Sequence, residues 1–103
     1  MPIHERGVSR SDVGAEAKLR NELVAELKKP QKTGEPAIII EHPSPGTTHL
    51  FVIWSSWEEM EQAVRSRIVL DAFAEARGQQ EAAEVTVSMG LTQVEAERLG
   101  IKL

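Results

Sequence analysis

Two short apolar segments joined by a proline-rich turn constrain the fold of this chain most strongly. Residues 37–40 and 50–54 are rich in β-branched and aromatic side chains, which favour strands. The segment 43–48 between them holds two prolines and a glycine, and these residues fix or permit the backbone angles of a turn. The sequence therefore predicts an antiparallel β-hairpin with strands at about 37–42 and 49–54.

Both faces of this predicted hairpin are apolar. Neighbouring side chains along a strand point to opposite faces, so a register that pairs His42 with His49 sorts them into two sets. One face then holds Ile38, Ile40, Phe51 and Ile53, and the other holds Ala37, Ile39, Leu50, Val52 and Trp54. A slip of one residue reshuffles the sets but leaves both faces apolar. Because a sheet with one face in water alternates apolar and polar residues, we expect cover over both faces.

The segment before the hairpin has helical periodicity. Leu19, Leu23 and Leu27 recur every four residues, which places them on one stripe of a helix. We expect this leading helix to span residues 12–29 and to stop at Pro30, since proline cannot continue a helix. Its stripe needs a surface to cover it, either the hairpin of its own chain or a second chain.

A long helix is predicted after the hairpin, over residues 57–77. Ser56 and Glu59 have the spacing of a capping box at its start, in which each side chain binds the backbone N–H of the other residue. Glu61 and Arg65 lie four residues apart, so we expect them to pair on its solvent-exposed side.

The last part of the chain allows two interpretations. Residues 79–89 begin with good helix formers and end with an alternating pattern typical of a strand. We favour a helix over 79–89, and the alternative is a third strand at 83–89. Thr92 and Glu95 have capping-box spacing and predict a final helix over 92–99. The expected class is therefore α+β, with a hairpin, a leading helix, a long helix and a C-terminal helical pair.

Length and composition limit the classes of function. The 103 residues suffice for one small domain at 11–103, preceded by a flexible polar arm at 1–10. The chain has no apolar run long enough to span a bilayer and no cysteine, so we expect a cytoplasmic protein. Its net charge of −4 argues against nucleic acid and anionic membranes as partners.

The candidate chemical residues are few. His42 and His49 flank the turn and are candidate metal ligands, but alternation points Glu41 away from His42 and no third ligand is evident. We therefore interpret them as polar residues at an exposed hairpin end and expect no metal or cofactor. Trp54 and Trp57 fit either a core at the hairpin–helix junction or an interface.

No catalytic motif is present in the sequence: neither a G-x-S-x-G elbow nor a glycine-rich phosphate loop occurs. Residues 91–101 resemble the opening helix and turn of helix-turn-helix DNA-binding units. This resemblance implies DNA contact, but Glu95 and Glu97 in that segment would repel phosphates. We expect no nucleic-acid partner.

A two-stranded hairpin is marginal on its own, and its edges carry unpaired backbone groups. The first hypothesis is therefore a non-enzymatic interaction module that binds itself as a homodimer, or another protein, through the hairpin or the leading helix. The candidate interface residues are Ile39, Leu50, Val52, Trp54, Trp57, Leu19, Leu23 and Leu27.

Two alternatives stay open. One is a ligand-binding or enzymatic domain whose pocket lies between the hairpin, Trp54 and residues 68–73, with His42 or His49 as acid or base. The other is a subunit of a larger complex that exposes its Trp54 face when isolated.

Overall fold

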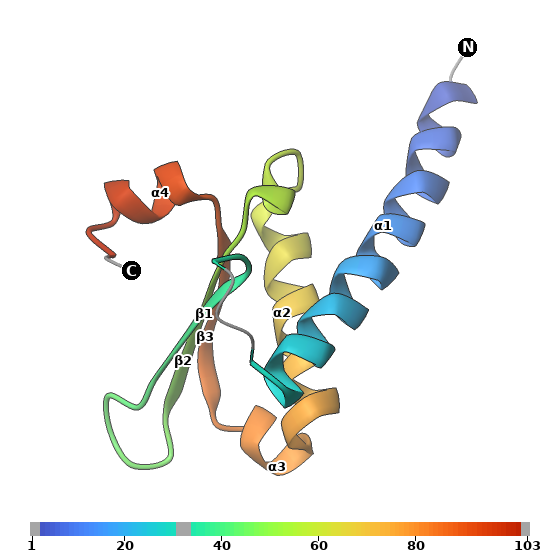
Figure 1. Cartoon of the computed structure of the whole chain (residues 1–103). Coiled ribbons are helices and arrows are strands. Elements are labelled where there is room, and N and C mark those ends of the chain that lie inside the picture. The colour runs from blue at the N-terminus through green and yellow to red at the C-terminus, as the bar shows by residue number, and fades with distance from the viewer. Residues whose placement is uncertain (1–2, 31–33, 102–103) are drawn as a thin grey trace.

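The computed structural model describes residues 3–30 and 34–101 and has the expected α+β class (Figure 1). The elements follow in the order α1 (Ile3–Lys28), β1 (Ala37–Glu41), β2 (Thr48–Ile53), the 3-10 turn η1 (Ser55–Trp57), α2 (Gln62–Arg77), α3 (Gln79–Ala82), β3 (Val85–Leu91) and α4 (Gln93–Arg98). Helices α1 and α2 pack along each other on one side of the sheet, and the first half of α1 projects beyond α2 (Figure 1).

The sheet has three strands in the order β1-β2-β3. Strands β1 and β2 form the expected antiparallel hairpin, whereas β3 pairs parallel to β2. Parallel neighbours need a long crossover connection, and α2 with α3 supplies it. The long helix therefore both covers the sheet and carries the chain back to the start of a third strand.

The alternative of a third strand is confirmed, although the strand spans Val85–Leu91 instead of 83–89, and the favoured helix over 79–89 is wrong beyond its first turn. Helix α3 ends at Ala82, and β3 begins at Val85. The backbone N–H of Thr48 donates to the carbonyl of Glu84 at 2.9 Å, which starts the pairing. Helix propensity is a weak preference that tertiary context overrides, and here β2 offers an open edge to a segment that also fits a strand.

The hairpin register differs by one residue from the expected one. Glu41, not His42, pairs with His49, because His42 belongs to the connection. That connection contains a turn in which the Thr47 N–H donates to the Ser44 carbonyl at 3.1 Å. The two faces are therefore regrouped. The face toward the helices, the inner face, holds Ile38, Ile40, Leu50 and Val52, and the outer face holds Ala37, Ile39, Phe51 and Ile53.

The core lies between the inner face and the helices α1 and α2. Its buried residues are Leu19, Leu23, Val24, Leu27, Leu50, Val52, Trp54, Trp57, Ile68, Val69, Ala72 and Phe73. On the outer face, among the described residues of the sheet, only Ile53 and Leu91 are buried, beneath Ala96 of α4. Ile39, Phe51 and Met89 on the same face are half-buried. The expectation of cover is met over the inner face and at one end of the outer face.

Two helix starts differ from expectation. Helix α1 begins at Ile3 rather than near residue 12; flexibility of residues 1–10 stays a prediction. Helix α2 begins at Gln62 and has no side-chain cap at Glu61. The expected capping box at the start of the long helix does not form, because the chain first makes the turn η1, which buries Trp57 completely. Within the described residues, no helix is long and apolar enough to cross a membrane.

Helix α4 begins as the sequence predicts. The Glu95 N–H donates to the Thr92 hydroxyl at 3.3 Å, and the Thr92 N–H donates to the Glu95 carboxylate at 2.8 Å. This reciprocal pair is a complete capping box. It sets α4 across the end of the outer face, where Ala96 covers Ile53 and Leu91.

Candidate functional site

Strand β1 lies at the edge of the sheet and, within the described part of the chain, pairs only with β2. Its sequence is Ala-Ile-Ile-Ile-Glu, and only the final residue is charged. An edge strand offers a row of N–H and C=O groups to another chain, and proteins normally protect such edges with charges, prolines or bulges. This edge has no such protection between Ala37 and Ile40, and Pro36 stands just before the strand.

The opposite edge of the sheet is partly satisfied within the chain. In β3 the Gly90 N–H donates to the side chain of Gln62 at 3.1 Å, and Arg65 donates to the Gly90 carbonyl at 3.1 Å. The hydroxyl of Ser88 donates to the carbonyl of Ser66 in α2 at 2.9 Å. Side chains and backbone of α2 therefore occupy polar groups of β3, whereas β1 has no comparable neighbour among the described residues. The unprotected edge of the sheet is β1.

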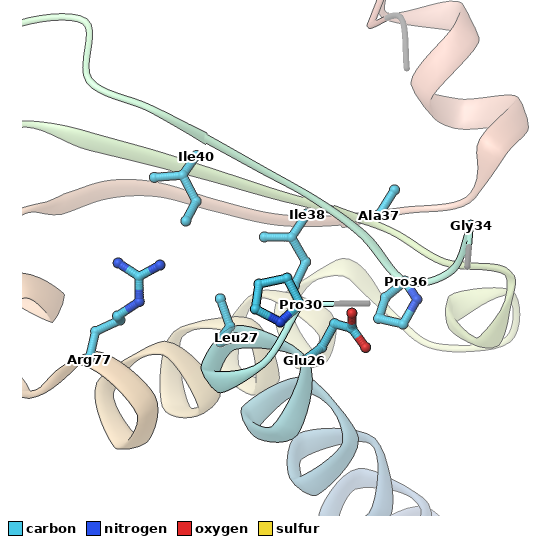
Figure 2. A pocket seen from close by; sticks show the side chains of 9 residues that line it. All are labelled: Glu26, Leu27, Pro30, Gly34, Pro36, Ala37, Ile38, Ile40 and Arg77. Atoms are coloured by element: carbon cyan, nitrogen blue, oxygen red, sulfur yellow. The ribbon is translucent and has the colours of Figure 1, made fainter. Parts of the chain in front are cut away.

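A groove of about 370 Å3 runs beside β1 on the inner side (Figure 2). Its apolar wall consists of Ile38 and Ile40 from β1, and Leu27 and Pro30 at the end of α1. Figure 2 shows both isoleucines pointing toward the helices, while Ala37 points to the other side of the strand. Its volume is within the range of about 300–1,000 Å3 for ligand pockets, so it can accept branched apolar side chains.

One charged group lies toward each end of this groove. Arg77, at the end of α2, lies near Ile40, and Glu26 of α1 lies near Pro36 (Figure 2). The Arg77 guanidinium lies 3.6 Å from the Glu81 carboxylate and 5.7 Å from the centre of the Phe73 ring. Its side chain is 40% exposed. The groove is therefore apolar in its middle, with a cation toward one end and a carboxylate toward the other.

The outer face adds an apolar surface next to the same edge. Ile39, Phe51, Met89 and Ile101 pack against the cluster under α4, yet each stays half-buried. His49 lies edge-on to Phe51, with ring centres 6.4 Å apart. This surface continues to Ile39 in β1, so a chain that pairs with the edge would also contact it.

The two candidate metal ligands do not share a face. The Nδ1 atom of exposed His42 lies 3.3 Å from the hydroxyl of buried Thr48. His49 follows Thr48 along β2 and therefore points to the opposite, outer face, where it lies against Phe51 and opposite Glu41. Among the described residues, no three histidine, aspartate or glutamate side chains are grouped as metal ligands.

Seven of the eight candidate interface residues are buried in the core of their own chain: Leu19, Leu23, Leu27, Leu50, Val52, Trp54 and Trp57. Only Ile39 lies on the half-buried outer face. The tryptophan rings meet edge to face, with centres 5.3 Å apart, and the Trp57 Nε1 donates to the Val52 carbonyl at 3.0 Å. They pack as core at the hairpin–helix junction.

Trp54, Ile68 and Phe73, which the sequence placed around a possible pocket, are all buried in the core. The groove instead lies beyond this core, at the edge of the sheet. Its lining comes from the ends of α1 and α2, from β1 and from the segment before it. No sequence spacing relates these segments, so sequence reasoning missed the groove.

Sequence reasoning also missed the role of Arg65. Its guanidinium is buried and donates to the carbonyls of Met60 and Gly90 and, at 2.7 Å, to the Glu95 carboxylate. The expected pair with Glu61 does not form, because Arg65 points inward toward β3. Hydrogen bonds from the Thr92 backbone N–H and from Arg65 hold the pKa of Glu95 below its usual value. These bonds fix α4 to α2 and β3.

Comparison with protein-family models, with curated proteins and with solved structures finds no match for this chain. The free edge of β1, its groove and the adjoining outer face are therefore the features from which a function is argued.

Proposed function

We propose that this protein is a non-enzymatic interaction module that forms a homodimer by pairing the free edges of two β1 strands. The observation that carries the proposal is the unprotected apolar edge of β1, from Ala37 to Ile40. Pairing would satisfy its open backbone groups and extend the sheet from three strands to six. An isologous two-fold contact is the commonest arrangement of homodimers.

The chemistry of the surface supports self-association over catalysis. Catalysis needs titratable groups that converge on a cavity, and the two described imidazoles of the hairpin lie toward different faces. The groove beside β1 is lined mainly by aliphatic and proline residues. The lack of cysteine is compatible with a cytoplasmic location, which stays a prediction.

Light scattering coupled to size exclusion tests the dimer directly. At loading concentrations between about 1 and 100 μM, we expect a mass that approaches twice the 11.4 kDa of one chain. A mass of one chain over this whole range would overturn the proposal.

A matched pair of variants locates the interface. Ile39→Lys places a charge in the middle of β1, a substitution that blocks edge pairing, and sets two like charges close together across a two-fold axis. We expect its dimer dissociation constant to rise at least about tenfold, equivalent to about 1.4 kcal/mol. The control is Val94→Lys on α4, a residue outside β1 whose side chain is 57% exposed. Equal effects of the two substitutions would refute an interface at β1.

A further inference from the structure

We propose that the two β1 strands pair antiparallel about a two-fold axis at Ile39, so that each copy fills the groove of the other with its own isoleucines. This inference rests on the dimer proposed above and specifies its register and its contacts. Ile39 is the middle residue of the five in β1, so this register pairs every residue of the strand. Ile38 then lies opposite Ile40 of the partner subunit, and Ala37 opposite the partner's Glu41.

The groove is placed to receive these side chains. A two-fold axis perpendicular to the sheet leaves both inner faces on the same side, because rotation about it does not exchange the faces. The partner strand would lie about 4.8 Å from β1, over the groove between β1 and the helix ends. Its inward side chains, the partner's Ile38 and the partner's Ile40, would then meet Leu27 and Pro30. Among the described residues the groove of one chain is open, and a second copy would close it.

The charges at the two ends of the groove select the same arrangement. Along β1, Glu26 lies at the Pro36 end and Arg77 at the Ile40 end (Figure 2). Antiparallel pairing brings opposite ends of the two grooves together, so Glu26 of each copy approaches Arg77 of the other. A parallel two-fold pairing has its axis along the strands, which exchanges the faces, so it would place the two grooves on opposite sides of the joined sheet and leave these charges without opposite charges across the interface. The polarity of the groove therefore favours the antiparallel two-fold over the parallel alternative.

Charge exchange tests this register. Glu26→Arg and Arg77→Glu each set two like-charged contacts across the interface, and we expect each variant to self-associate about tenfold more weakly than the wild type. The double variant restores opposite charges and should recover the wild-type dissociation constant to within about threefold. In an equimolar mixture, every cross-chain contact between the two single variants joins opposite charges, so the mixture should form heterodimers in preference to either homodimer.

Two controls separate the interface from local effects. Glu81→Gln removes the partner that Arg77 has in its own chain, 3.6 Å away, and should leave dimerisation unchanged. Thermal unfolding of each variant verifies that the monomer fold is retained. In the mixing experiment the homodimers and heterodimers form from the same two variant chains, so local effects of the substitutions are the same in each.

The outcomes distinguish this inference from the proposed function. If the wild type dimerises and Ile39→Lys prevents it, but the charge variants associate normally and mix at random, the register is wrong and the edge dimer stands. If the wild type is a monomer at about 100 μM, both fall. Recovery in the double variant together with preferred heterodimers supports the antiparallel register.

Discussion

Substitution of Gly90 by alanine should destabilise the fold strongly. A Cβ atom at this position would lie 2.8 Å from the Cβ of Arg65 and 2.8 Å from Cε2 of Trp57, whereas ordinary contacts are 3.4–4 Å. Neither neighbour can move easily. The Trp57 ring is completely buried and bound to the Val52 carbonyl, and the Cβ of Arg65 is fixed by the backbone of α2.

The magnitude follows from overpacking. Insertion of a methyl group into a packed core costs about 1–3 kcal/mol. For a domain of this size, each kcal/mol lowers Tm by roughly 4–8 °C, so we expect a decrease of roughly 5–20 °C. Thermal and urea unfolding, followed by circular dichroism at one fixed protein concentration, measure the change.

Gly14→Ala is the matched control. Gly14 lies in α1, is exposed, and has no atom within 4 Å of an added Cβ. Alanine in a helix is favoured over glycine by about 0.5–1 kcal/mol, so this variant should be equal to or slightly more stable than the wild type. A Gly90→Ala protein whose unfolding free energy lies within about 0.5 kcal/mol of the wild type would refute the packing of Trp57 against β3.

Three further substitutions test the junctions of the fold. Glu95→Gln should lower stability at pH 7 by no more than about 1 kcal/mol, because the Glu95 side chain is 40% exposed. Because its hydrogen bonds hold the folded-state pKa of Glu95 below the ordinary value of 4.5, the stabilisation by Glu95 is present above that pH and is lost as the pH falls through the folded-state pKa. Urea unfolding at pH 7 and pH 3 should therefore show a smaller difference between Glu95→Gln and the wild type at pH 3, and an unchanged difference would contradict the link to Arg65. Trp57→Phe should cost about 1–3 kcal/mol, since it removes a hydrogen bond of 3.0 Å to the buried Val52 carbonyl and leaves a smaller ring in a completely buried site; equal urea midpoints would count against that contribution. Thr92→Ala should cost about 1 kcal/mol through loss of the cap of α4, measured in the same way, and an unchanged midpoint would show that the cap contributes little.

Structural features that depend on residues close together in the chain are predicted well from the sequence. The hairpin follows from two apolar runs and a proline-rich turn, and the cap of α4 follows from the spacing of Thr92 and Glu95, both as the structure has them. These features depend on residues close together in the chain. The leading and long helices are likewise present, although their first residues differ from the predicted ones.

Features that depend on distant contacts could not be predicted in the same way. The register moved by one residue because the turn, closed between Ser44 and Thr47, leaves His42 outside β1. Gly90 lies in β3, where Trp57 and Arg65 leave no room for a side chain. Spacing along α2 predicted a solvent-exposed pair for Arg65, and its true partner, Glu95, is thirty residues away.

The candidate site also divides into features that the sequence predicts and features that depend on distant contacts. The apolar strand that forms the free edge was evident from the sequence, as was the need of the hairpin for cover. Most residues chosen as its interface proved to be core, because the chain supplies α1 and α2 over the inner face. The groove combines residues from α1, β1 and α2, and only the folded chain brings them together.

A single cysteine at position 39 tests the edge-to-edge dimer most directly, since the chain contains no other cysteine. In the proposed dimer the two Ile39→Cys side chains face each other across the two-fold axis, within the Cα separation of about 4.4–6.8 Å that a disulfide requires. In Ala37→Cys the two thiols would be roughly 13 Å apart along the strands, which is too far. Under mild oxidation we predict a covalent dimer for Ile39→Cys and almost none for Ala37→Cys. Equal cross-linking of the two variants, or none in either, would contradict the account.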